Sequence, residues 1–137
     1  MVRLLNTVFA ALLLAVLSFA KINPEYPPYF TSPTKESVWH IGDPVEVEWN
    51  NVLYETGTVN VTFQPAPNTA LEFLVPKRVV AVNAPAANSC GGECGRVSFV
   101  IDNLNKDQDL GSYQIVLTLN DDGTEIPSDI FQVTAWP

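Results

Sequence analysis

The chain has 137 residues, with 7 Lys and Arg against 15 Asp and Glu, and a formal net charge of −8 at pH 7. This length suits one domain with its own hydrophobic core rather than two. The acidic balance argues against binding to nucleic acid, which requires a basic surface, and against electrostatic docking to anionic lipid. The acidic charge is compatible with a neutral polysaccharide or a basic protein as the binding partner.

Residues 1–20 predict a cleavable secretory signal peptide. Arg3 supplies a positive charge, an apolar run extends from Val8 to Phe19, and small residues precede a cleavage site after Ala20. The alternative is a membrane anchor, but the apolar run is shorter than the ~20 residues needed to cross a bilayer. The sequence ends without an apolar tail, so we expect a secreted chain with no membrane span and no GPI anchor.

Residues 21–37 form a proline-rich lead-in that is expected to be extended, and a β domain is predicted over residues 29–137. Several segments alternate apolar with polar residues, which is typical of strands that have one buried face. The alternation is clearest at residues 45–49, 59–63, 97–101 and 113–119. Weaker strands are expected near Tyr29–Ser32, Val38–Ile41, Leu71–Val75, Val79–Asn83 and Ile130–Thr134.

Turn residues separate these segments, and a series of about seven short strands predicts a β-sandwich, with a barrel as the lesser alternative. The sequence Asp109-Leu110-Gly111-Ser112-Tyr113 directly precedes an alternating strand, as in the tyrosine corner of immunoglobulin-like domains. Trp49 continues the buried register of Val45 and Val47, so Trp49 and Tyr113 are predicted to be core residues. The expected fold is an all-β, immunoglobulin- or fibronectin-III-like β-sandwich.

Cys90 and Cys94 are the two cysteines of the chain, and the two glycines between them favour a tight turn. In an oxidising compartment such a pair predicts a local disulfide that pins a loop rather than holding the fold. A redox pair or a metal site is the alternative. Because His40 is the single histidine, further soft ligands are lacking and we expect no metal.

Enzymatic activity is not expected, and no cofactor is predicted. A hydrolase usually needs paired carboxylates at a cleft, whereas Glu46 and Glu48 are predicted on an outward strand face and Asp121 and Asp122 in a turn. A serine triad needs a histidine, and His40 lies in no nucleophile motif.

Several short motifs of the predicted β domain have a familiar order. Near its start lie Ser32-Pro33-Thr34, Val38-Trp39 and Gly42-Asp43-Pro44, and near its end lie Gly111-Ser112-Tyr113 and Ser128-Asp129-Ile130-Phe131. Over about residues 29–134 this order resembles the N-terminal Ig-like domain of the fungal yeast-cell-wall-synthesis family and of Ser/Thr-rich, GPI-anchored wall proteins. The resemblance implies a role in the assembly of cell-wall β-glucan. Unlike many members, this sequence lacks the Ser/Thr-rich tail and carries a cysteine loop.

Exposed aromatic rings commonly bind sugars by stacking, and the candidates here are Trp39, Trp136, Tyr29 and Tyr54. The alternative is that these rings pack against the edges of the sandwich. Asn60-Val61-Thr62 is a glycosylation sequon, with Asn60 on the outer face of its predicted strand.

Taken with the resemblance, these features predict a secreted, non-catalytic module, extracellular or wall-associated, that contacts β-glucan or supports its assembly. The alternative is a released factor that binds an extracellular protein, which the acidic charge and the missing anchor favour. An enzyme is a third and weaker hypothesis.

Overall fold

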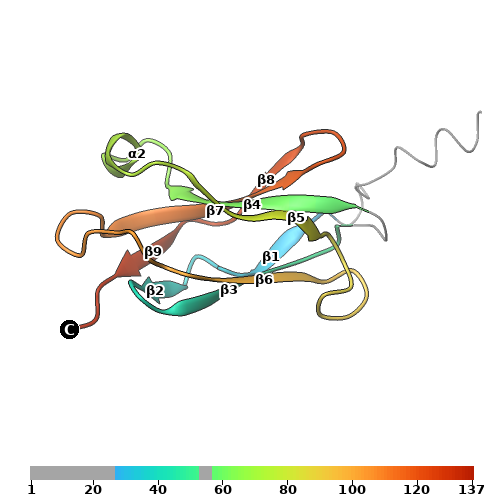
Figure 1. Ribbon diagram of the computed structural model, residues 1–137, viewed down its shortest axis with the longest axis horizontal. Coiled ribbons are helices and arrows are strands. Elements are labelled where there is room, and N and C mark those ends of the chain that lie inside the picture. The colour runs from blue at the N-terminus through green and yellow to red at the C-terminus, as the bar shows by residue number, and fades with distance from the viewer. Residues whose placement is uncertain (1–26, 53–56) are drawn as a thin grey trace, which may run out of the picture.

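The computed structural model describes residues 27–52 and 57–137. The predicted signal peptide, the first six residues of the lead-in (21–26) and Tyr54 lie outside the described residues. Two packed layers of strands make up the described part of the chain, with one short helical turn (Figure 1). In chain order the elements are β1 Tyr29–Ser32, β2 Val38–His40, β3 Pro44–Asn50, β4 Thr58–Pro65, α2 Leu71–Leu74, β5 Arg78–Pro85, β6 Gly95–Val100, β7 Gly111–Leu119, β8 Glu125–Pro127 and β9 Phe131–Thr134.

The smaller sheet has the strand order β1-β3-β6, and the larger has the order β2-β9-β7-β4-β5, with β8 also paired to β7. β2 and β9 pair in parallel, and the other pairs are antiparallel. β5 pairs with β4 and so belongs to the larger sheet, whereas constant-type immunoglobulin domains place the strand at this point of the sequence in the opposite sheet. The division of the strands into these two sheets nevertheless confirms the predicted immunoglobulin-like β-sandwich.

The core lies between the two sheets and follows the alternation of the sequence. On β3, Val45, Val47 and Trp49 are buried while Glu46 is exposed. Trp49 and Tyr113, both expected in the core, have no exposed surface. The other large side chains that are fully buried are Phe131, Ile101, Ile115, Leu117, Val47, Val59, Val61, Val133 and Pro33. Burial of this set is the main stabilising contribution to the fold.

The predicted strand over Leu71–Val75 is wrong, because this segment forms the helical turn α2. Leu71 and Val75 are both buried, and the Val75 N–H donates to the Leu71 carbonyl at 2.9 Å. A buried pair four residues apart is a helical spacing, but in so short a segment it also fits alternation. The three residues between them are therefore all turned to solvent.

Two further differences concern β7 and its neighbour. β8 was not expected, because a three-residue strand that ends in Pro127 carries almost no alternation signal. Val116 was expected on the outer face, yet it is only 7% exposed. β7 has strands on both sides, and Val116 lies between Thr62 of β4 and Pro127 of β8, which explains its burial.

Within the described residues, no helix is long and apolar enough to span a membrane.

Candidate functional site

The candidate sugar-binding aromatics do not come together in the structure. Trp39 is only 9% exposed, and its ring centroid lies 4.4 Å from that of Phe131 and 5.9 Å from that of Phe99. Its expected contact with a glycan is therefore wrong, because β2 turns the indole into the core. The edge-packing alternative holds for this residue.

Tyr29 and Trp136 are exposed, but at opposite ends of the sandwich. Tyr29 is 49% exposed and lies opposite Asn50, at the end of β3. Trp136 is bonded to Asp43, which directly precedes the start of β3. No common platform can include both rings, and of the two we take Trp136 as the candidate site.

Trp136 is both exposed and fixed in place. Its side chain is 61% exposed, and its ring stacks on His40 with centroids 3.9 Å apart and planes 11° from parallel. The indole Nε1–H donates to Asp43 Oδ1 at 2.9 Å. One face of the indole is thus covered by an imidazole and one edge is held by a carboxylate, which leaves the opposite face toward solvent.

The local backbone explains why these three side chains meet. The parallel pairing of β2 with β9 sets His40 beside Thr134, two residues before Trp136. A turn through Gly42, whose φ is 94°, then brings Asp43 back toward His40. His40 Nδ1 lies 3.8 Å from Asp43 Oδ2, so the carboxylate contacts both rings.

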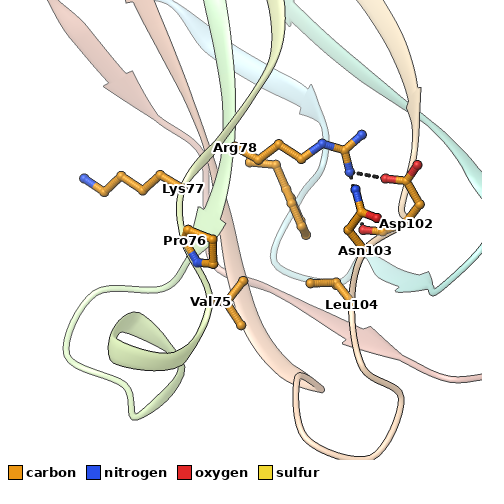
Figure 2. A pocket seen from close by; sticks show the side chains of 8 residues that line it. Val75, Pro76, Lys77, Arg78, Asp102, Asn103 and Leu104 are labelled. Atoms are coloured by element: carbon orange, nitrogen blue, oxygen red, sulfur yellow. Dashed lines mark hydrogen bonds and ion pairs between the residues drawn. The ribbon is translucent and has the colours of Figure 1, made fainter.

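A pocket of about 250 Å³ is lined by the connections that lie at the same end of the molecule as the C-terminus (Figure 1), and Figure 2 shows it from close by. It lies between the α2–β5 connection and the β6–β7 connection, and reaches inward to Phe63 of β4. The Arg78 guanidinium forms an ion pair with the Asp102 carboxylate across it (Figure 2). The other lining residues are Val75, Pro76, Lys77, Asn103 and Leu104.

Beside this pocket, α2 presents two large apolar side chains to solvent. Phe73 is 89% exposed and Leu74 is 66% exposed. Sequence reasoning missed both residues because it assigned them to a strand. The signal that identifies them is the buried pair Leu71 and Val75, which forces the intervening residues outward.

The predicted tyrosine corner is present and fixes the base of the β6–β7 connection. The Tyr113 hydroxyl donates to the Asp109 carbonyl at 2.6 Å, and the ring stacks on Phe63 with centroids 4.8 Å apart. Burial, together with the nearby negative charge of Asp109, raises the pKa of Tyr113 to about 12. The hydroxyl therefore remains protonated and continues to donate throughout the physiological pH range.

The opposite end carries the predicted Cys90–Cys94 disulfide, which the structure confirms. Its loop is fastened to the core at both sides: Trp49 Nε1–H donates to the Ala86 carbonyl at 2.9 Å, and Gly95 lies directly against the Trp49 ring. Glu48 brings a carboxylate within 4.8 Å of the two sulfurs, but those sulfurs are bonded to each other. The oxidised loop thus offers Glu48 alone as a ligand among these three.

Asn60 lies in β4 on the outer face of the larger sheet and is partly exposed, as expected from the alternation. Its Oδ1 accepts hydrogen bonds from the Asn83 N–H at 3.0 Å and from Asn120 Nδ2 at 3.2 Å. Glycosylation of Asn60 stays a prediction.

No protein-family model matches the sequence, and a search of curated proteins finds no match. Among solved structures the chain is similar to that of titin M4 in its trigonal crystal form. The identity is 13%, the similarity covers 80% of this chain and 95% of the titin chain, and the TM-score is 0.39. The assignment to the immunoglobulin-like class depends on the strand pairing and the tyrosine corner of this chain itself.

Proposed function

We propose that this chain is a secreted, non-catalytic binding module of a fungal cell wall or extracellular matrix, and that it contacts β-glucan through Trp136. The observation that carries the proposal is the exposed indole whose orientation is already fixed by His40 and Asp43. The resemblance of the opening and closing motifs to fungal wall proteins supports the choice of β-glucan.

The physical argument is one of preorganisation. A flat apolar ring can stack on the C–H face of a pyranose, while neighbouring polar groups hydrogen-bond the hydroxyls and set the orientation. An indole that is already held loses little conformational freedom on binding, so more of the contact energy appears as affinity. His40 and Asp43 both hold the ring and supply polar atoms at its edge.

A binding role rather than catalysis is supported by where the carboxylates lie. Glu46 and Glu48 are both within ion-pairing distance of Arg96, at 3.8 Å and 3.0 Å, on the outer face of the smaller sheet. In the pocket, Asp102 is the acidic residue among the lining side chains, and it is paired with Arg78. In both places the carboxylates are engaged in ion pairs with an arginine, whereas glycoside hydrolysis commonly uses two carboxyl groups that flank a bound sugar in a cleft.

The experiment is retention of the secreted chain on insoluble β-1,3-glucan, β-1,6-glucan and chitin. We expect saturable binding to a β-glucan that weakens at least about tenfold in Trp136→Ala, a loss of about 1.4 kcal/mol. His40→Ala frees the ring and should give a smaller loss. Tyr29→Ala is the matched control, because it removes an exposed aromatic from the opposite end. Equal binding by Trp136→Ala, or no retention of the native chain, would contradict the proposal.

A released protein-binding factor is the second candidate. It is favoured by the exposed apolar pair Phe73 and Leu74 beside the pocket, since large contiguous apolar surface often marks a protein contact. Crosslinking of the secreted chain in its native culture medium distinguishes the two candidates. Protein adducts without any glycan retention would favour the second.

A further inference from the structure

We infer that the chain forms a symmetric dimer through the surface around the pocket, with Phe73 of each copy inserted into the pocket of the other. This inference does not depend on glycan binding, which concerns Trp136. It rests on the shape, the composition and the charge of the surface formed by α2, the α2–β5 connection and the β6–β7 connection, which we name the pocketed face (residues 71–78 and 102–110).

The projecting half of the contact is α2. Phe73 is the most exposed of the large apolar side chains in the described part of the chain, at 89%, and Leu74 beside it is 66% exposed. The fold prevents Phe73 from turning inward, because Leu71 and Val75 already occupy the buried side of the same helical turn. Covering this pair would remove a substantial apolar area from water.

The receiving half is the pocket. Its walls include Val75 and Pro76 on one side and Leu104 on the other (Figure 2). Phe63 is also among its lining residues. An apolar protein cavity of about 150 Å³ is large enough to hold benzene. The volume of about 250 Å³ found here therefore accommodates a phenyl ring.

The two halves lie next to each other on one surface, and this placement points to a second copy as the occupant. A two-fold dimer uses the same patch on both subunits, so the patch must carry a projection and a matching recess. Phe73 and Val75, on the projection and on the pocket wall, are two residues apart. Each copy can therefore offer its ring and receive the other's.

Charge favours the same face. The whole chain has a net charge of −8, so two copies repel each other overall. Over the pocketed face the charges nearly balance, with Glu72, Asp102, Asp107 and Asp109 against Lys77, Arg78 and Lys106. Close approach of two copies costs least where their charges balance.

Because the proposed contact centres on two exposed apolar side chains from each copy, we expect a reversible dimer with a dissociation constant in the micromolar range. Analytical ultracentrifugation of the secreted native chain, in a concentration series without glucan, measures it directly. Phe73→Asp removes the projection, and we expect its dissociation constant to rise at least about tenfold. Val82→Asp is the matched control, because Val82 is 65% exposed on β5, away from this face, and its dimer should be unchanged.

A complementation test distinguishes reciprocal insertion from general stickiness. Leu104→Arg places a charged side chain in the pocket, so this variant should also be monomeric. If thermal melting shows that Leu104→Arg is not folded, Pro76→Arg serves as the blocked variant instead, because Pro76 lines the pocket and is exposed. An equimolar mixture of Phe73→Asp with the blocked variant should associate again, because one intact ring meets one intact pocket.

Four outcomes would count against the inference. The first is a native chain that stays monomeric up to about 1 mM. The second is a dimer that Phe73→Asp leaves intact, and the third is a mixture that fails to associate. Capture of a different protein by Phe73 without self-association would also count against it.

Discussion

The two ends of the sandwich differ in whether their aromatic side chains are buried or exposed. At the disulfide end, Trp49 is fully buried and its N–H donates to the Ala86 carbonyl, so the indole holds the cysteine loop against the core. At the pocketed end, Trp136 and Phe73 are exposed, and the Trp136 N–H donates to the Asp43 side chain rather than to a loop carbonyl.

This difference indicates that the aromatic residues at one end stabilise the fold, whereas those at the other end are available to bind a partner. A buried indole whose N–H is satisfied contributes apolar burial without an unpaired donor, which suits a structural role. An exposed ring contributes little to folding and stays available for a ligand. We therefore expect substitutions at the disulfide end to lower the free energy of unfolding, whereas substitutions of Trp136 and Phe73 change binding and leave unfolding nearly unchanged.

The largest loss in the free energy of unfolding is expected from Gly95→Ala. A Cβ atom at this position would overlap the Trp49 ring, so either β6 or the indole must move. Overpacking of this kind costs about 3 kcal/mol. Chemical denaturation of the purified chain measures the loss.

Gly92→Ala is the control for this substitution. Gly92 has a φ of 54° and an added Cβ there meets nothing within 4 Å, so its cost is the backbone strain of about 1 kcal/mol. Similar losses in the two variants would show that contact with Trp49 does not make Gly95 necessary.

A smaller effect is expected when the disulfide is removed by the double substitution Cys90→Ala and Cys94→Ala. The bridge joins residues only four positions apart, so closing the loop accounts for at most about 2 kcal/mol. The hydrogen bond from Trp49 to Ala86 should still hold the loop. We expect unchanged glucan retention and dimerisation, since both belong to the other end; a loss of either would contradict the separation of the two ends.

The fold was more predictable from sequence than the site, for a physical reason. Alternation reports directly which side chains face the core, and on β3 and β4 it placed Val47, Trp49 and Val61 correctly. The Asp109–Tyr113 sequence is likewise a local signal, because the hydroxyl and the carbonyl that it bonds lie only four residues apart.

The candidate site depends on contacts between residues that are distant in sequence. Trp136 meets Asp43 across 93 positions, and this contact follows from the parallel pairing of β2 with β9. Trp39 stayed a candidate glycan contact on the sequence alone, because a three-residue strand does not show which of its faces is buried. Phe73 was missed because the spacing of Leu71 and Val75, in so short a segment, fits a strand as well as a helical turn.

The smallest effect at neutral pH is expected from Tyr113→Phe, at the pocketed end. This variant keeps the ring stacked on Phe63 but loses the hydrogen bond to Asp109, at a cost of about 1 kcal/mol. The raised pKa makes this cost depend on pH. Below pH 10 the hydroxyl is protonated in both the folded and the unfolded chain, and the stabilisation is fully present.

Between about pH 10 and pH 12 the unfolded chain releases the proton while the folded chain, with its Tyr113 pKa of about 12, retains it. The native protein should therefore lose stability over this range by a linkage that Tyr113→Phe lacks. The difference in unfolding free energy between the two should shrink or reverse at pH 11. The other titrating groups are common to both chains and cancel in the comparison, so a difference that stays constant from pH 7 to pH 11 would contradict a raised pKa of Tyr113 in the folded chain.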